Sequence, residues 1–597
     1  MSIVTLNKAT LIGLTADKAS ILDRLQALGL LHVIPLAQAQ PELVAELPDG
    51  VHPEQLQQAI RYLLSCPRKR RQVVAERHFK LSRVVADVLD NRKRHLELSE
   101  QHDFLRKRIR DLEPWGSFEL PGEHGLQGHR LWFYLVPNYR MAEVAKTDLP
   151  WAVVHRDNRY SYVAVIAEEE PRANQMPVPR THTGSVPLSQ LRRELEDLAI
   201  EIETLDAERE AHTRWLFLLQ RSLAGSQDQA ECETVSQQAL DAGEVFALQG
   251  WFPESRREQL QQFAAAEGMV LVTETVADDE RPPTLLDNPV QLAGGEEIVR
   301  FYQMPGYRAW DPSRVVFFSF AAFFALILSD AGYAFLLALV LLLYWRTMGR
   351  SETGRRLRIL GSTLALFSAV WGVLVGSYFG ASPPELLAPL KQFDMNDFDS
   401  MMQVSVIMGA GHLLLANLIS AWRSRTRLQA LVPVGWMLLV LAGVSAWLRQ
   451  QMDVEWGVIG LGLALILLFS STRPWHGGRN LLWRVVDGLL ALTGVSKMFG
   501  DVLSYLRLFA LGLASASLAI TFNQLATDVA AAVPGMGLFL EVVILLLGHL
   551  LNFVLAVVSG VIHGLRLNLI EFYNWSLADE GYAFQPFTKR EVNPWIT

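Results

Sequence analysis

The chain has 597 residues, a formal net charge of -8 and two cysteines, Cys66 and Cys232. Its length exceeds a typical domain of about 100–200 residues, so at least two separately packed regions are expected. The charge shows no basic signature of nucleic-acid binding, and neither cysteine stands in a CxxC or metal-ligand spacing, which argues against a zinc site or a disulfide framework. Residues are mostly polar before about position 313 and mostly apolar after it.

The first three hundred residues predict a cytoplasmic arm. Residues 1–30 carry charged side chains where a signal peptide needs an apolar core. The segment 8–36 predicts a strand, an amphipathic helix and a second strand. Its sequence GLTADKAS, at 13–20, lacks the Gly-Lys-Ser/Thr ending of a phosphate loop. No nucleotide, cofactor, metal or catalytic site is therefore predicted there or elsewhere in the chain.

Two helical stretches in the arm predict a rod. Residues 53–113 are almost free of Gly and Pro after Pro67, as in a long exposed helix, and the basic run at 68–71 is interpreted as a solvated face rather than a lipid-binding patch. In the second stretch, 187–238, apolar residues recur at alternating steps of three and four, which predicts the seam of an antiparallel coiled coil. These residues are Leu188, Leu191, Leu195, Leu198, Ile202 and Leu205.

Strand patterns complete the expected α+β arm. Residues 131–136 and 161–167 predict strands between the two helical stretches, and 245–276 repeat a strand, helix, strand order. We therefore expect two small α/β lobes, at 1–50 and 244–280, joined by the coiled coil within an arm that spans residues 1–300.

Residues 301–597 predict an all-α membrane domain of eight transmembrane helices. Six apolar segments reach the about 20 residues that a helix needs to cross a bilayer; they are 357–380, 401–422, 428–448, 454–471, 489–525 and 536–575. The region 315–345 is too long for one upright span and is interrupted by turn formers at 329–332, so it predicts a tight helical hairpin. Arginine-rich loops alternate with acidic ones, as the positive-inside rule requires when both termini are cytoplasmic. The last two spans are long enough to be tilted.

Polar residues in the last two spans form the candidate ion-translocation site. Arg507 is followed by several apolar turns, where an arginine costs at least about 2.5–3.5 kcal/mol on insertion scales. An arginine that reaches the interface from a helix end is the alternative, because Asp501 and Ser504 come just before it. Arginine stays protonated, so it cannot relay a proton, but it can force a passing carboxylate to ionise.

The final span adds a polar stripe with a spacing of three or four residues, or a multiple of it, which is typical of a water-accessible path. The stripe consists of His549, Asn552, Ser559, His563 and Arg566. Glu541 near its outer end and Glu571 near its inner end are candidate mouths of this path, although either can be an ordinary interfacial charge.

Several motifs resemble the a/I subunit family of V-type and A-type rotary ATPases, whose members are membrane stator subunits. The resemblance covers essentially the full length. It is carried by SYLRLFALGLA at 504–514, HGLRLNLIEFY at 563–573 and EGYAFQPF at 580–587, with support from SDAGYAF at 329–335, WGVLVGSYFG at 371–380 and LQGWFP at 248–253. Arg507 and Arg566 match the two arginines of that family's interface with the rotor.

The resemblance implies an ion-translocating subunit of a rotary ATPase or ATP synthase, multi-pass in a bacterial or archaeal inner membrane. Its expected partners are a rotor ring of c/K proteolipid subunits, peripheral stalk subunits of E/G type, the base of the central stalk and membrane lipid. Nucleotide sits on other subunits of such complexes. Eukaryotic members have polar residues where this chain has Thr493, Ser515 and Ala556, so the bacterial and archaeal branch fits better.

Two other functions stay open from the sequence: a secondary transporter with a cytoplasmic rod, and a membrane scaffold. A transporter of that kind predicts inverted repeats, and residues 315–575 show no convincing repeat between their halves. A scaffold needs neither Arg507 nor the polar stripe. Both H⁺ and Na⁺ fit the stator interpretation, because the selective carboxylate would belong to the ring.

Overall fold

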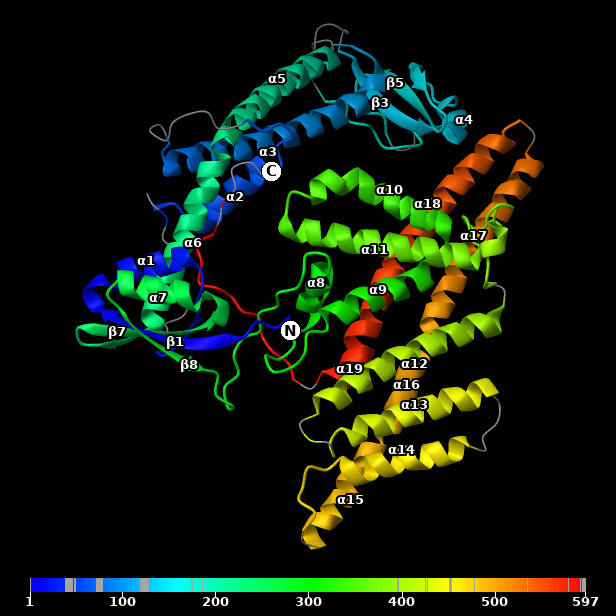
Figure 1. Ribbon diagram of the computed structural model, residues 1–597. Coiled ribbons are helices and arrows are strands. Elements are labelled where there is room, and N and C mark those ends of the chain that lie inside the picture. Colours follow the sequence, from blue (N-terminus) through cyan, green and yellow to red (C-terminus); the bar gives the residue numbers. More distant parts are fainter. Residues whose placement is uncertain are drawn as a thin grey trace. The chain divides into compact units, whose positions relative to one another are not determined.

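The computed structural model describes residues 2–37, 47, 50–70, 79–118, 128–172, 175–184, 186–394, 397–424, 426, 428–449, 454–476, 478–533, 535–577, 579–590 and 592 (Figure 1). The chain divides into two compact units. Unit 1 consists of Met1–Thr15, Leu30–Leu36 and Asp241–Phe587, and unit 2 of Ala16–Gly29, Ala37–Leu240 and Thr588–Thr597.

Unit 1 contains an antiparallel sheet formed by strands from both ends of the predicted arm. The strands are β1 (Leu6–Leu14), β2 (His32–Ile34), β6 (Leu240–Ala242), β7 (Val245–Pro253) and β8 (Val270–Thr275). Their order is β2-β7-β1-β8, with β6 beside β7, and α7 (Arg257–Ala266) connects β7 to β8. Leu6, Ala9 and Leu11 on β1 are buried at 1% exposure or less, as expected of a central strand.

This sheet corrects the prediction of two separate lobes. The strands predicted at 8–36 and 245–276 exist, but β1 pairs with β7 from Leu6–Pro253 to Leu14–Val245, so the two segments form one sheet. Each segment alone leaves an unpaired strand edge, and pairing the two satisfies those backbone groups.

Unit 2 holds the other elements of the arm. Its elements are α1 (Lys18–Leu28), α2 (Pro53–Leu64), α3 (Leu81–Leu112), β3 (Arg130–Pro137), α4 (Met141–Val144), β4 (Trp151–Arg156), β5 (Tyr160–Ala167), α5 (Leu188–His212) and α6 (Leu216–Gln238). The strands form an antiparallel sheet in the order β3-β5-β4. The sequence predicted β3 and β5 and missed β4, an edge strand in which every residue is exposed.

The helices of unit 2 pack in pairs. The long helices α3 and α5 lie side by side, and α1 and α2 pack on α6. The single helix predicted over 53–113 is wrong: α2 ends at Leu64, and Pro67 follows within three residues, where it cannot continue a helical hydrogen-bond ladder. Arg68, Lys69 and Arg70 of the basic run lie in the non-helical connection, and Arg71 lies outside the described residues.

The remainder of unit 1 is helical. Its elements are α8 (Ala293–Tyr302), α9 (Ser313–Leu328), α10 (Ala331–Met348), α11 (Glu352–Val375), α12 (Phe398–Arg423), α13 (Leu431–Arg449), α14 (Glu455–Phe469), α15 (Gly478–Leu492), α16 (Gly494–Ser504), α17 (Leu506–Ala532), α18 (Gly537–Arg566), a π-helical turn (Leu567–Phe572) and α19 (Tyr573–Ser576).

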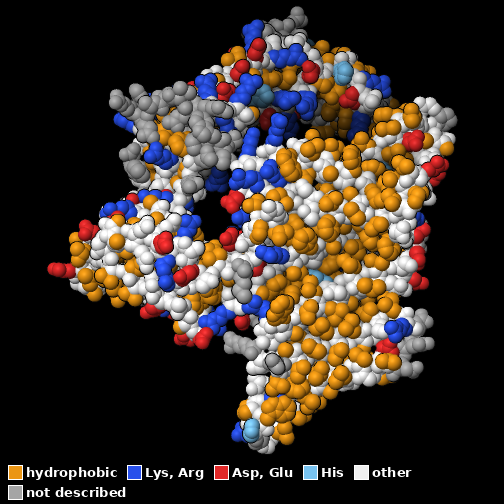
Figure 2. Space-filling model, viewed as in Figure 1, with side chains coloured by type: hydrophobic (Ala, Val, Ile, Leu, Met, Phe, Trp, Pro, Cys, Tyr) orange, Lys and Arg blue, Asp and Glu red, His pale blue; other side chains and the backbone are white. Residues whose placement is uncertain are grey.

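Six helical stretches among the described residues are long and apolar enough to cross a membrane. They are Ala331–Met348, Glu352–Val375, Phe398–Arg423, Leu431–Arg449, Gly478–Ala532 and Gly537–Ser576, while Ser313–Leu328 and Glu455–Phe469 are shorter apolar helices. Figure 2 shows hydrophobic side chains over most of the visible face of this helical part. Such a large exposed apolar surface is typical of a surface that contacts lipid or other membrane subunits.

The region 315–345 forms two helices, but they are not a tight pair. The break falls where the turn formers predicted it, because Ser329 has a left-handed φ of 44° and the Asp330 side chain caps α10 by accepting from the Tyr333 N–H. However, α11 packs against both α9 and α10, which hardly touch each other. Helix α11 therefore separates α9 from α10.

Candidate functional site

Arg507, near the start of α17, and Arg566, the last residue of α18, converge on the carboxylate of Glu571. Arg566 Nε lies 3.5 Å from Glu571 Oε1, and Arg507 Nη1 lies 4.0 Å from the same oxygen. Glu571 is only 2% exposed, whereas the Arg566 side chain is half exposed and that of Arg507 is 24% exposed. Two guanidinium groups thus share one buried carboxylate, which leaves one excess positive charge in this cluster.

The charged cluster is incompletely paired. Arg507 Nη1 and Glu571 Oε2 are both buried and have no hydrogen-bond partner among the described residues. The same is true of His563 Nδ1, one turn before Arg566 on α18. Unpaired buried polar atoms are costly, so these three atoms are the ones in the cluster whose hydrogen-bonding capacity the described residues leave unused.

A change of helical winding places Glu571 between the arginines. Residues 567–572 form a π-helical turn between α18 and α19, and single π turns recur at functional sites because they shift the side chains that follow. Trp575 on α19 ties the following turn to α16, because its Nε1 donates to Asp501 Oδ2 at 2.7 Å. Phe572 stacks on His412 at 4.3 Å, and His412 Nδ1 lies 2.8 Å from the Tyr505 hydroxyl.

A second polar cluster surrounds His549, nearly five turns before Arg566 on α18. The Tyr333 hydroxyl lies 2.9 Å from His549 Nδ1, and His549 Nε2 lies 3.0 Å from Asn523 Oδ1 on α17. Asn552 Nδ2 donates to the Tyr333 hydroxyl at 2.9 Å and to the Ser515 carbonyl at 2.8 Å. These contacts are all satisfied when Tyr333 donates to Nδ1 and a neutral His549 donates from Nε2 to Asn523 Oδ1.

The second cluster rests on a buried carboxylate. Asp330 is 2% exposed and accepts from the N–H groups of Tyr333, Phe379 and Gly380, each at 3.0 Å, and from the Ser377 hydroxyl at 2.6 Å. Phe379 has a left-handed φ of 54° and its carbonyl accepts from Asn523 Nδ2 at 2.8 Å. Backbone strain of this kind persists where surrounding contacts enforce it. The motifs at 329–335 and 371–380 therefore contact each other through Asp330, beside the His549 network.

Comparisons with known proteins point to one family. No family model matches the chain. Among curated proteins, it is 27% identical to the V-type ATP synthase subunit I of Chlamydia pneumoniae, over 85% of this chain and 86% of the relative. It is 26% identical to the V-type ATP synthase subunit I 1 of Treponema pallidum, over 98% and 100% of the two chains.

An archaeal relative, the A-type ATP synthase subunit I of Methanocaldococcus jannaschii, is 27% identical over 58% of this chain and 55% of the relative. The chain is thus similar, over most of its length in the bacterial cases, to proteins named V-type or A-type ATP synthase subunit I. Among solved structures, the cytoplasmic N-terminal domain of a V-ATPase subunit I covers 45% of this chain and 99% of that chain with 14% identity and a TM-score of 0.24, which is too low to establish a shared fold.

The predicted stripe on α18 is not uniform. His549 and Asn552 belong to the neutral cluster, and Arg566 belongs to the charged one. Ser559 and His563 lie between them. Ser504 lies at the end of α16, and Glu541 and Ser559 lie on α18, where their side chains form no hydrogen bond or ion pair with other described residues.

The structure places Glu571 in a buried environment and adds residues to the site that the sequence analysis did not single out. Glu571, predicted as a candidate mouth, is a buried counter-charge. Asp330, Tyr333 and Asn523 complete the neutral cluster. A signal for Asp330 was present, because it is an acid within an apolar region, whereas Tyr333 and Asn523 carry no charge that would single them out.

The family motif EGYAFQPF forms a strap from the charged cluster to the sheet of unit 1. After α19, the Gly581 N–H donates to the Met304 carbonyl at 3.0 Å, and the Phe587 N–H donates to the Leu31 carbonyl at 2.8 Å. Between them, His32 Nδ1 lies 3.0 Å from both the backbone N and O of Gln585. The end of the last apolar helix is thus tied to β2.

Proposed function

We propose that this chain is the ion-translocating stator subunit of its rotary ATPase and that Arg507 forces release of the ion from a carboxylate of the passing ring. The observation that carries the proposal is the convergence of Arg507 and Arg566 on the buried Glu571, in which Arg507 Nη1 has only a 4.0 Å ion pair and no hydrogen-bond partner among the described residues.

Charge balance explains how this cluster would act. Arg507 and Arg566 together exceed the single charge of Glu571, so the cluster attracts one more anion. A ring carboxylate that reaches Arg507 would pair with Nη1, and the guanidinium would favour its ionised form and expel the proton or Na⁺ that it carries. Glu571 would keep the arginine fixed when no ring carboxylate is present, because a buried guanidinium without a counter-charge is costly.

The residues along α18 supply the proposed path on either side of Arg507. We assign the half-channel from the outer side to Glu541, His549 and Asn552, and the inner one to Ser559, His563, Ser504 and Glu571. A neutral histidine whose ring joins a donor to an acceptor can pass a proton without holding a charge. The arginines, which stay protonated, cannot.

The proposed topology counts α9 and α14 with the six membrane-length stretches, which makes eight crossings with both termini in the cytoplasm. Arg346, Arg350, Arg423 and Arg473 then share the cytoplasmic side, in accord with the positive-inside rule. We place the division between the cytoplasmic arm and the membrane domain near residue 300.

The arm would anchor the stator. The side-by-side helices α3 and α5 are proposed to form an antiparallel coiled coil that binds peripheral stalk subunits of E/G type. The ring of c/K subunits and the base of the central stalk are the other proposed partners. ATP synthesis or hydrolysis would take place on other subunits.

The test is Arg507→Gln in the assembled complex, reconstituted in vesicles. We expect ATP-driven ion transport to fall to background, because Gln keeps hydrogen bonding but removes the fixed charge. Arg449→Gln, at the exposed end of α13, is the matched control and should transport normally. A scaffold would retain transport after Arg507→Gln, and that result, with normal assembly, would overturn the proposal.

A further inference from the structure

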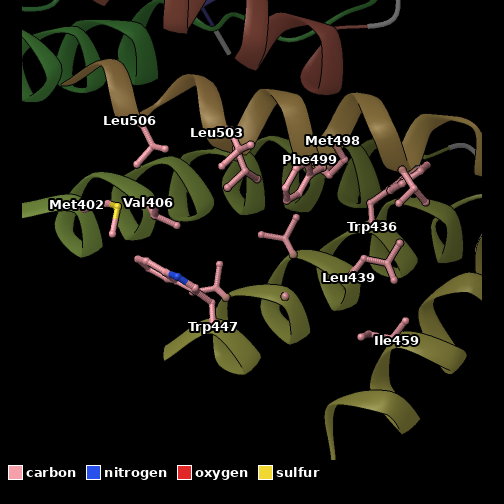
Figure 3. A pocket seen from close by; sticks show the side chains of 15 residues that line it. Met402, Val406, Trp436, Leu439, Trp447, Ile459, Met498, Phe499, Leu503 and Leu506 are labelled. Carbon is pink, nitrogen blue, oxygen red and sulfur yellow. The ribbon is translucent and has the colours of Figure 1, made fainter. Parts of the chain in front are cut away.

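A large apolar pocket lies beside the charged cluster and is not used by the proposed mechanism. It has a volume of about 510 Å³ and is walled by α12, α13, α14, α16 and the first residue of α17 (Figure 3). Every side chain that lines it is apolar, apart from the indole N–H groups of Trp436 and Trp447. The volume lies in the range of ligand pockets, about 300–1,000 Å³.

We infer that this pocket binds one acyl chain of a membrane phospholipid. Water does not fill an apolar cavity of this kind stably, and a void of this size would weaken the packing around it. Apart from the shorter apolar helix α14, the walls belong to helical stretches long and apolar enough to cross a membrane, so hydrocarbon is the solvent that reaches the opening. No charged side chain lines the pocket, so the headgroup stays outside it.

The size of the pocket excludes a helix of another subunit. A helix with its side chains is about 10–12 Å across, so roughly one turn would fill the whole volume, and a straight membrane span could not continue past it. An acyl chain is thinner and bends, so it can follow the pocket from Leu506 and Met402 toward Met498 and Trp436, which lie at opposite ends in Figure 3.

The chain would pack against the helix that leads into the site. Val495, Met498, Val502 and Leu506 recur every three or four residues and form the pocket wall on α16 and the start of α17. Asp501, which holds Trp575, and Arg507 are on the same helices but do not line the pocket. The acyl chain thus supports the backbone that carries Arg507 without touching the charged groups.

Gly443 offers a way to close the pocket. It lies on the α13 wall, and a Cβ atom at this position would meet no atom within 4 Å. Gly443→Leu therefore places a side chain in the cavity without a steric clash at Cβ, and it replaces a poor helix former by a good one. Gly411 on α12 also has open space around a Cβ but does not line the pocket, so Gly411→Leu is the matched control.

The experiment uses the complete ATP synthase complex in liposomes that contain a phospholipid with a photoreactive group near the end of one acyl chain. Cross-linked peptides are identified by mass spectrometry. We expect labelling of residues 495–506 and 436–447 in the unaltered chain, a loss of at least fivefold in Gly443→Leu, and no loss in Gly411→Leu.

Val444→Phe closes the same pocket from the next position and replaces Gly443→Leu if that variant fails to assemble. Equal labelling in Gly443→Leu, which fills the pocket, and in the control Gly411→Leu would overturn the inference. Cross-links from the pocket to a ring subunit in place of lipid would also overturn it. Labelling is read without ion transport, so its outcome is independent of the Arg507→Gln test.

Discussion

The neutral network around His549 and the charged cluster around Glu571 lie on α18 and the turn that follows it, yet their polar atoms are paired differently. In the neutral network, Tyr333, His549 and Asn523 have consistent donors and acceptors. In the charged cluster, Arg507 and Glu571 each keep a buried atom without a partner among the described residues. The first region is paired among the described residues, and the second keeps polar atoms whose hydrogen-bonding capacity those residues do not use.

In the proposed path, this difference would separate two tasks. The neutral His549 ring can take up a proton on one ring nitrogen and release the proton of the other, and it regains its starting tautomer when the ring reorients. A cluster of two arginines and one carboxylate has a fixed net positive charge. It can change the ionisation only of a titratable group that approaches it. The contrast can be tested by removing the central member of each cluster.

The largest effect is expected for Glu571→Gln. The change leaves Arg507 and Arg566 without their shared counter-charge, and breaking a buried ion pair from one side costs about 3–5 kcal/mol; the half-exposed Arg566 places the effect near the lower value. ATP-driven ion transport by the reconstituted complex should fall below a tenth, as roughly 3 kcal/mol is a factor of more than 100. Glu571→Asp, which keeps the charge, should recover part of it.

The control for this prediction is Asp528→Asn, which removes an exposed carboxylate near the other end of α17. It should leave transport unchanged. Normal transport by Glu571→Gln would mean that the arginines do not depend on this carboxylate, and the contrast between the two clusters would then be lost.

A smaller effect is expected for Tyr333→Phe in the neutral network. Loss of the hydroxyl leaves His549 Nδ1 without its donor and removes one acceptor of Asn552, and a buried polar atom left unpaired costs about 1–3 kcal/mol. The complex should melt at a lower temperature and pump ions several times more slowly. Thermal unfolding and transport assays measure the two effects.

Tyr378→Phe is the matched control, because the Tyr378 hydroxyl is buried and has no hydrogen-bond partner among the described residues. Its removal should change neither quantity. If Tyr333→Phe behaved like this control, the network would be neither a relay nor a support of the site.

Residue spacing predicted the candidate site only in part. The three- and four-residue recurrence in the last span correctly placed polar residues along one helix. It could not show that the stripe divides, because the groups that divide it come from α10, α17 and the π-helical turn. An ideal helix through 567–572 would have moved Glu571 by part of a turn, and nothing in the composition of this segment reveals the change in winding.

The fold was predictable where periodicity is local. The helix at 18–28 and the strands at 6–14, 130–137 and 245–253 follow from alternation and amphipathic spacing. Pairing across about 240 residues, which joins β1 to β7, depends on which edges remain open after folding. The edge strand β4 was missed because no buried face imposes alternation on it.

The smallest expected effect concerns the strap between the charged cluster and β2. Burial lowers the pKa of His32, against the opposing effect of its hydrogen bond to the Gln585 backbone, so the folded strap favours the neutral ring. The unfolded ring, with a pKa near 6.5, binds more protons. The stability that His32 gives to the strap is therefore present above about pH 6.5 and is lost as the pH falls through the lower folded pKa.

Hydrogen exchange of residues 580–587 in the complete complex measures this effect. Protection, corrected for intrinsic exchange, should fall between pH 7.5 and 5.5 by no more than about tenfold, since one pKa unit corresponds to about 1.4 kcal/mol. His32→Phe keeps a ring between Tyr582 and Phe584 but does not titrate, so its strap should show the same protection at both pH values. An equal pH response in this variant would assign the loss to another group. If ion transport by the complex persisted while the strap loosened, the proposed site would depend on charge within the apolar helices and not on the tie to β2.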